Sequence, residues 1–375
     1  MVGQAYLIPL EAYQFDLRSE KVNSIARLIK LQIPTVPLPH VLLPSSFEFY
    51  RQNKRLAPKA EKELASFFTK LQRAGYPATV RPSIFADIPG AEFIVANNVN
   101  LPTFEEMKAA IAAGYDQVLK EFGQAVKIEF AHLLQGFYTA NKAGVVYSED
   151  GAGGVYISAV FGEHTWLITR GEVEPDIYRV DKKTPEIKDK KIATKKFSLE
   201  PSASGLKRVR LAAVARTLAV FTDQEINQIF EYALRMEKAH GPQEIEAAVL
   251  RTGQVIFQSS RDSQVKKQPI STAENLPIFL QPVKGKLVFI NRPENLSRDW
   301  RDWIVATDNL DIDFITHLVY RAQPKAVVLT KGSLTAHAVT ILREAKIPSI
   351  LAPGFQIGRE KFCRIKANGQ INCYS

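Results

Sequence analysis

The sequence is poor in cysteine and in long hydrophobic runs, and each shortage excludes a class of protein. Only two of the 375 residues are cysteines, so the chain is not a small secreted scaffold held together by disulfides. No apolar run approaches the roughly 20 residues of a membrane-spanning helix. The N-terminus has neither the basic segment nor the apolar core of a signal peptide. We therefore expect a cytoplasmic protein with no membrane partner.

The two cysteines, Cys363 and Cys373, flank a predicted hairpin turn at Asn368-Gly369. A two-residue turn there would pair position 363 with 374 and position 364 with 373. The cysteine side chains would then point to opposite faces of the hairpin and could not bridge easily. We therefore expect two free thiols.

The composition is that of a globular protein, with 46% hydrophobic and 23% charged residues. The length predicts two domains, or three. The net charge of +10 suits an anionic ligand such as ATP. The densest run of lysines, residues 182–196, is followed by a single aromatic residue, Phe197. Nucleic-acid-binding surfaces usually combine basic residues with stacking aromatic residues, so we do not expect a nucleic-acid partner.

The residues around His337 carry the most informative pattern. The apolar run at residues 326–329 predicts a buried strand, and Gly332 follows it. After His337, apolar residues recur at helical spacing until Pro348 ends the helix. Residues 349–351 then predict another strand. His337 is therefore expected at the N-terminus of a helix that follows a strand.

This position suits phosphoryl chemistry. A helix N-terminus stabilises an anion through its unpaired N–H groups and its partial positive charge. A neutral imidazole can attack a phosphoryl group and hold it as phosphohistidine. The same local pattern is also typical of a histidine that only forms a hydrogen bond at a helix start. The local pattern alone leaves both interpretations open.

Residues 331–348 resemble the phosphohistidine motif of the PEP-utilising enzymes, the family of PEP synthase, pyruvate phosphate dikinase and rifampicin phosphotransferase. The matching residues are Gly332, Thr335, His337, Ala338, Arg343, Ile347 and Pro348. The resemblance implies that His337 is the catalytic residue that receives the phosphoryl group.

The rest of the chain resembles the ATP-binding part of the same family, most clearly in Gly171-Glu172-Val173-Glu174-Pro175-Asp176-Ile177-Tyr178 and in residues 237–261. The resemblance implies that Lys21, Arg81 and Arg261 contact the ATP phosphates. It also implies that Glu246 and Gln258 hold Mg²⁺ together with ATP. Carboxylate and amide oxygens are ligands that Mg²⁺ accepts, with most of its waters retained.

The fold implied by the resemblance is α/β and α+β. An ATP-grasp-like domain would cover residues 1–262, with subdomains of about 1–125 and 126–262. Residues 263–276 would form a linker, and residues 277–375 a small swivelling phosphohistidine β/α domain. The resemblance does not extend to the family's barrel that binds PEP or pyruvate, so we expect this chain to lack it.

The implied function is that of an ATP-dependent, dikinase-type phosphotransferase with ATP and Mg²⁺ as cofactors. His337 would pass its phosphoryl group to an acceptor, either a small molecule or a separate protein. In the family, two glycines precede the lysine that matches Lys21, whereas this chain has Ser19 and Glu20. That difference favours an alternative, a catalytically weak ATP-binding regulatory partner of a larger PEP synthase-like enzyme.

Overall fold

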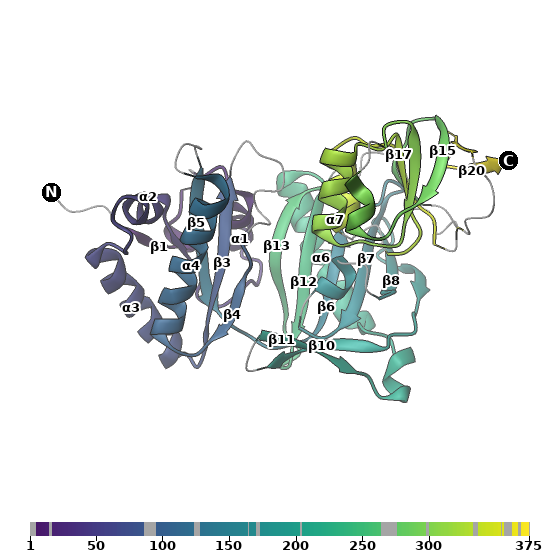
Figure 1. Cartoon of the computed structure of the whole chain (residues 1–375). Coiled ribbons are helices and arrows are strands. Elements are labelled where there is room, and N and C mark those ends of the chain that lie inside the picture. Colours follow the sequence, from purple (N-terminus) through teal and green to yellow (C-terminus); the bar gives the residue numbers. More distant parts are fainter. Residues whose placement is uncertain are drawn as a thin grey trace.

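Three large β-sheets follow one another along the described chain in a computed structural model, which also contains a two-stranded sheet (Figure 1). The structure describes residues 5–14, 17–85, 95–123, 128–163, 165–169, 173–202, 205–263, 276–297, 300–332, 337–353, 355, 362–366 and 369–374. We call residues 5–263 the N-terminal unit and residues 276–374 the C-terminal unit. Most of the expected linker, residues 264–275, lies outside the described residues. Within the described parts, no helix is both long and apolar enough to cross a membrane.

The first sheet is antiparallel and lies in the purple and blue part of Figure 1. Its strands, in spatial order, are β1 (Leu7–Pro9), β2 (His40–Leu42), β5 (Glu129–Gly136), β3 (Ala78–Phe85) and β4 (Asn98–Leu101). Helices α2 (Pro44–Asn53), α3 (Pro58–Arg73) and α4 (Phe104–Phe122) bury apolar side chains against it. Thr103 and Glu106 form a capping box at the start of α4.

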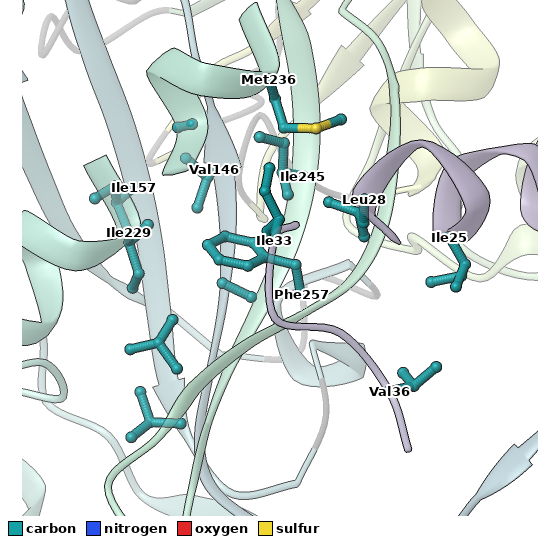
Figure 2. Packing of buried hydrophobic residues seen from close by; sticks show 14 of the residues in the cluster. Ile25, Leu28, Ile33, Val36, Val146, Ile157, Ile229, Met236, Ile245 and Phe257 are labelled. Atoms are coloured by element: carbon teal, nitrogen blue, oxygen red, sulfur yellow. The ribbon is translucent and has the colours of Figure 1, made fainter. Parts of the chain in front are cut away.

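The second sheet is also antiparallel. Its spatial order is β13 (Val255–Asp262), β12 (Gln243–Leu250), β6 (Ala140–Tyr147), β7 (Gly154–Phe161), β8 (Asp176–Asp181) and β9 (Ile187–Lys191). Val146, Ile157 and Ile245 are direct cross-strand neighbours, so their side chains share one face. Helices α1 (Glu20–Lys30) and α6 (Asp223–His240) pack on that face through residues such as Leu28 and Met236 (Figure 2).

The chain passes from the first sheet to the second between Gly136 and Ala140. Strand β5 belongs to the first sheet, although it follows the expected subdomain boundary at residues 125/126. A hairpin of β10 (Phe197–Ser202) and β11 (Gly205–Arg210) projects from the second sheet. It reaches β4 of the first sheet, where the Asn100 amide donates a hydrogen bond of 3.3 Å to the Ser202 carbonyl. The two sheets are therefore bridged at one end. The short elements of this unit are η1 (Leu10–Ala12), α5 (Trp166–Thr169) and η3 (Ala213–Thr217).

The third sheet forms the C-terminal unit. Its spatial order is β14 (Leu276–Phe279), β18 (Ser349–Leu351), β17 (Ala326–Leu329), β16 (Trp303–Thr307), β15 (Val283–Phe289), β19 (Phe362–Ile365) and β20 (Ile371–Tyr374). Strands β15 to β18 run parallel to one another. The helical elements are η4 (Pro293–Ser297), α7 (Ile312–His317), the short π-helix η5 (Leu318–Ala322) and α8 (His337–Glu344). The strands expected at 326–329 and 349–351, and the helix expected to begin near His337, are confirmed.

The prediction of free thiols was wrong, because Cys363 and Cys373 form a disulfide. They lie directly opposite each other in β19 and β20, with their Cα atoms 4.0 Å apart. The pairing continues to Lys366 and Gln370, so three residues rather than two close the hairpin. Gly369, the last of the three, has φ +81°, which is the left-handed position of a three-residue hairpin loop. The extra turn residue shifts the register by one and brings the two sulfurs to the same face.

Candidate functional site

A cleft lies between the first and second sheets. It is walled by strands β3 and β13, by the segment that joins β5 to β6, and by β11 of the bridging hairpin. The lining residues are Thr79, Arg81, Asn97, Val99, Gln135, Phe137, Tyr138, Glu163, Leu206 and Gln258. Two of them, Arg81 and Gln258, are residues that the sequence assigned to ATP.

Several buried polar atoms that line the cleft have no hydrogen-bond partner. Among the described residues, five of the lining side chains hold a buried atom without a hydrogen bond: Thr79 Oγ1, Asn97 Oδ1, Gln135 Oε1, Glu163 Oε1 and Gln258 Nε2. Buried polar groups are normally paired, because an unpaired one loses its hydrogen bonds to water without replacement. Such atoms in one concave site, next to an arginine and apolar walls, are what a polar ligand requires.

Gln258 owes its position to a β-bulge in β13. Glu246 of β12 lies opposite Ser259, and the next residue of β12, Ala247, lies opposite Phe257, so Gln258 is an extra residue. A bulge of this kind redirects a side chain and is common beside functional sites. The Arg81 guanidinium of β3 donates a hydrogen bond of 3.2 Å to the Gln258 carbonyl. This contact ties the two sheets together at the floor of the cleft.

Glu163 is a buried carboxylate in this cleft to which the sequence assigned no role. Its Oε2 accepts a hydrogen bond of 2.9 Å from the Ala140 amide. Burial raises the pKa of its carboxyl group to about 7, with opposition from Ala140 and Arg251. The group therefore exchanges a proton near neutral pH, as many residues of functional sites do.

Glu246 lies beside the cleft on β12. Its carboxylate accepts hydrogen bonds from Thr165 Oγ1 at 2.7 Å and from Ser259 Oγ at 3.0 Å. Burial raises the pKa of the Tyr138 hydroxyl, while the charge of Arg81 lowers it and the charges of Glu246 and Glu163 raise it further. Arg81 thus contacts Gln258, and Glu246 contacts Ser259, the residue after Gln258; their roles toward ATP stay a prediction.

The residues fit a magnesium ion that is shared with a ligand. The described residues contain no cluster of three or more His, Cys, Asp or Glu side chains that could enclose a metal by themselves. Mg²⁺ usually keeps several waters and binds through one or two carboxylates plus substrate phosphates. One carboxylate at Glu246 and one amide at Gln258, beside a cleft with free polar atoms, satisfy that requirement.

Lys21 and Arg261 lie next to the cleft but are not among its lining residues. Lys21 stands in the first turn of α1, and its ammonium group donates a hydrogen bond to the Pro82 carbonyl, one residue from Arg81. Arg261 pairs with Glu244 at 2.6 Å, and the Glu244 charge raises the pKa of the guanidinium further. Lys21 is therefore held at a residue next to Arg81, and Arg261 lies three residues after Gln258 in sequence.

His337 is the first residue of α8, directly after the segment that follows β17. Residues 333–336 of the predicted motif lie outside the described residues. Burial raises the pKa of the Tyr147 hydroxyl at the end of β6, and the charges of Glu244, of Arg343 in α8 and of Arg261 also act on it.

Comparison with known proteins identifies relatives of part of this chain. Residues 102–276 match the sequence model of a family described as pyruvate phosphate dikinase, AMP/ATP-binding domain. A probable phosphoenolpyruvate synthase from Archaeoglobus fulgidus is 25% identical over 60% of this chain and 32% of its own length. Another from Methanocaldococcus jannaschii is 30% identical over 39% of this chain and 12% of its own length. This chain is a distant homologue of phosphoenolpyruvate synthases. It spans about a third of the length of the Archaeoglobus relative.

The homology covers some of the candidate residues and not others. Gln135, Glu163, Glu246, Gln258 and Arg261 fall inside the matched residues 102–276. Lys21, Arg81 and His337 fall outside them. The ATP-binding part of the sequence-based prediction is therefore supported at the level of the domain, and the role of each residue is a matter for proposal.

Solved structures resemble the chain only weakly. D-alanyl-alanine synthetase A from Vibrio cholerae gives a TM-score of 0.32 at 12% identity, over 66% of this chain and 58% of that protein. An acetyl-coenzyme A synthetase from Ca. Korarchaeum cryptofilum gives 0.36 at 13% identity, over 63% of this chain and 89% of that protein. Likenesses at this level carry no argument about this chain.

Proposed function

We propose that this chain is an ATP-dependent, dikinase-type phosphotransferase that forms phosphohistidine at His337. The phosphoryl group would then pass to an acceptor, a small molecule or a separate protein. The observation that carries the proposal is the cleft between the first two sheets. Five buried polar atoms without partners line it, beside Arg81 and within or next to the region that resembles an AMP/ATP-binding domain.

The cleft suits a nucleotide in an ATP-grasp-like arrangement. Apolar side chains of Val99, Phe137 and Leu206 offer walls for a base. At the other side, Arg81 supplies a planar guanidinium that matches phosphate oxygens in pairs. Glu246 and Gln258 would hold Mg²⁺, which neutralises phosphate charge when bound. Lys21 and Arg261 would add positive charge at the edge of the site after exchanging their present partners.

The chemistry requires one nucleophile and a mobile phosphoryl group. An imidazole nitrogen of His337 would attack the β-phosphorus of ATP, forming a P–N bond while the bond to the α-phosphate oxygen breaks and AMP leaves. Hydrolysis of the remaining γ-phosphoryl group would release phosphate and leave phosphohistidine. The positive charge of Arg81 offsets the charge that develops on the transferred group. The N-terminus of α8 would stabilise the product anion.

Such an enzyme needs its histidine to visit two places, so residues 277–375 would act as a domain that swings about residues 263–276. The packing of the chain is compatible with this. Each described hydrophobic cluster lies wholly within residues 10–257 or wholly within residues 278–365. Units without a shared apolar core commonly move relative to each other.

The test is incubation with ATP labelled at the β-phosphate, with Mg²⁺ present. We expect a protein-bound phosphate that survives base and is lost in acid, as a phosphoramidate should be. His337→Ala and His337→Asn should both remove the label, because neither side chain is a competent nucleophile. Both variants should still bind ATP, since the cleft lies in the N-terminal unit. A label that persists in His337→Ala, or never appears in the wild type, contradicts the proposal.

A second candidate is a catalytically weak, ATP-binding regulatory partner of a larger PEP synthase-like enzyme. One observation favours it: the backbone N–H groups just before α1 already have a hydrogen-bond acceptor within the protein. The backbone amides of Arg18 and Ser19 donate hydrogen bonds to Glu129 Oε1 at 2.7 and 3.3 Å, where a phosphate loop would leave amides free. ATP binding without any labelled histidine would support this candidate.

A further inference from the structure

A second cavity lies beside the β10–β11 hairpin and is separate from the candidate nucleotide cleft. It is walled by the start of β6, the end of β7, strand β10, the segment around η3 and the turn after β12. None of its lining residues also lines the cleft. Its volume is about 280 Å³, which is near the lower end of the range for ligand pockets, about 300 to 1,000 Å³. The cavity therefore suits a small molecule.

The walls of this cavity are held in place by backbone contacts. Gly162 has φ +112°, and a Cβ atom there would lie 2.4 Å from the Leu199 carbonyl oxygen, so β10 packs against the end of β7 more closely than a side chain permits. Around η3, Arg216 Nε donates a hydrogen bond of 3.1 Å to the Leu211 carbonyl. The Lys195 amide donates one of 2.9 Å to the Arg216 carbonyl. The cavity is therefore preformed by the fold.

One positive and one negative side chain line the cavity. Arg251 stands in the turn after β12, and its exposed guanidinium makes no hydrogen bond or ion pair with the residues that the structure describes. The carboxylate of Glu200, on β10, accepts a long hydrogen bond of 3.4 Å from Ser198 Oγ. Within the same described part of the chain, Glu200 has no ion pair. The two charges therefore line one cavity without neutralising each other.

The remaining lining is mainly apolar, with Phe161, Pro201, Leu211, Ala215 and Leu218. Leu218 is 52% exposed, although a leucine gains free energy when its surface leaves water. An apolar group inside the cavity would cover part of that surface. The combination of apolar walls with a few polar groups is that of a small-molecule site, where the polar groups fix the orientation of the ligand.

We propose that this cavity binds a small zwitterion, an α-amino acid with an aliphatic side chain. The guanidinium of Arg251 pairs with the ligand carboxylate, whose two oxygens match its planar donors. The Glu200 carboxylate pairs with the ligand ammonium group, and the aliphatic chain packs on Leu211 and Leu218. A ligand with one charge alone leaves the other charge of the cavity unpaired, which gives specificity. The inference does not depend on phosphoryl transfer, because it uses no residue of the cleft or of α8.

The experiment is titration calorimetry of the full-length protein without nucleotide, with three probes. L-leucine carries both charges, 4-methylpentanoate lacks the ammonium group, and 3-methylbutylamine lacks the carboxylate. The variants are Arg251→Gln and Glu200→Gln, which each remove one charge, and Ala215→Phe, which fills the cavity with a phenyl ring. Arg73→Gln and Glu231→Gln are the matched controls, because both residues are exposed on helices of the N-terminal unit and neither lines the cavity.

We expect L-leucine to bind at millimolar concentration or below, and each analogue to bind at least about fivefold more weakly. Arg251→Gln and Glu200→Gln should each weaken leucine binding about five- to tenfold, the loss expected for a partly exposed ion pair of good geometry. Arg251→Gln should not weaken the binding of 3-methylbutylamine, because that probe has no carboxylate, and Glu200→Gln should not weaken that of 4-methylpentanoate. Ala215→Phe should block leucine, and both controls should match the wild type.

Three outcomes overturn the inference. The first is the absence of leucine binding to the wild type at millimolar concentration. The second is wild-type affinity for leucine in Arg251→Gln or in Ala215→Phe, which would place the ligand elsewhere. The third is 4-methylpentanoate binding as tightly as leucine, which would remove Glu200 from recognition. A wild type that never forms phosphohistidine would defeat the proposed function and leave all three of these measurements unaffected.

Discussion

Replacement of Glu163 by glutamine should make the protein more stable above neutral pH and leave its stability unchanged near pH 4.5. Burial raises the pKa of this carboxyl from an ordinary 4.5 to about 7 in the folded protein. Between these two values the folded state binds more protons than the unfolded state, so stability falls as pH rises. At about 1.4 kcal/mol per pH unit, the ionised group costs the folded state about 3 kcal/mol above pH 7.

Glutamine removes this cost because it cannot ionise, and its amide oxygen can still accept the Ala140 hydrogen bond. Urea unfolding at pH 5 and pH 8 measures the effect as a difference between variant and wild type. The gain from Glu163→Gln should approach about 3 kcal/mol at pH 8 and be small at pH 5. Glu231→Gln, at an exposed position of α6, should give no pH-dependent difference. Equal pH profiles for Glu163→Gln and wild type would refute the reasoning.

Three further predictions concern other parts of the N-terminal unit. Glu246→Ala should abolish the Mg²⁺-dependent rise in melting temperature with ATP while the unliganded protein stays folded; an unchanged rise would remove Glu246 from the site. Burial lowers the pKa of His132 to about 3, so stability should fall by about 1.4 kcal/mol per unit as pH drops below 6.5. Urea titrations of His132→Leu should lack that component, and a retained slope would contradict it. Thr222→Ala removes the hydroxyl that accepts the Glu225 amide at 3.2 Å, so urea unfolding should show about 1 kcal/mol less stability. A loss near zero would mean that the cap is redundant.

The elements that could be predicted from sequence are those with local causes. Helix α4 follows from its apolar spacing and from the capping pair Thr103 and Glu106. The strand of residues 326–329 is apolar throughout and lies centrally in a parallel sheet. A continuous apolar run is the sequence pattern expected for a strand that is buried on both faces. The hairpin at the C-terminus was also predictable, but its register was not. The turn length is decided by one glycine at positive φ, and two residues or three are both compatible with Asn368-Gly369.

The cleft could be predicted only in part, because its defining property is not local. Arg81 and Gln258 were found through motifs, yet nothing in the sequence tells that β3 and β13, about 175 residues apart, meet there. The bulge that frees Gln258 depends on pairing between β12 and β13. Glu163 carries no sequence signal for its burial, because a glutamate after glycine is usually exposed. The place of Glu163 in the cleft could be recognised only from the three-dimensional position of its unpaired carboxylate oxygen.

The start of α1 shows how the chain differs physically from a phosphate-binding loop with glycines. Helix N-terminal amides need an acceptor, and in such a loop the acceptor is the ligand phosphate. Here the Glu129 carboxylate of β5 accepts the N–H groups of Arg18 and of the N-cap residue Ser19, just before α1, and the Ser19 hydroxyl bonds the Ser83 hydroxyl of β3. A nucleotide phosphate would have to displace a negative charge already in place. Under the proposed function, phosphate binding would therefore depend on the side chains of the cleft, above all Arg81, more than on the backbone before Lys21. This difference bears on the choice between the two proposed functions. A catalytic protein must hold the β-phosphorus rigidly for attack, whereas a regulatory protein needs only to bind the nucleotide.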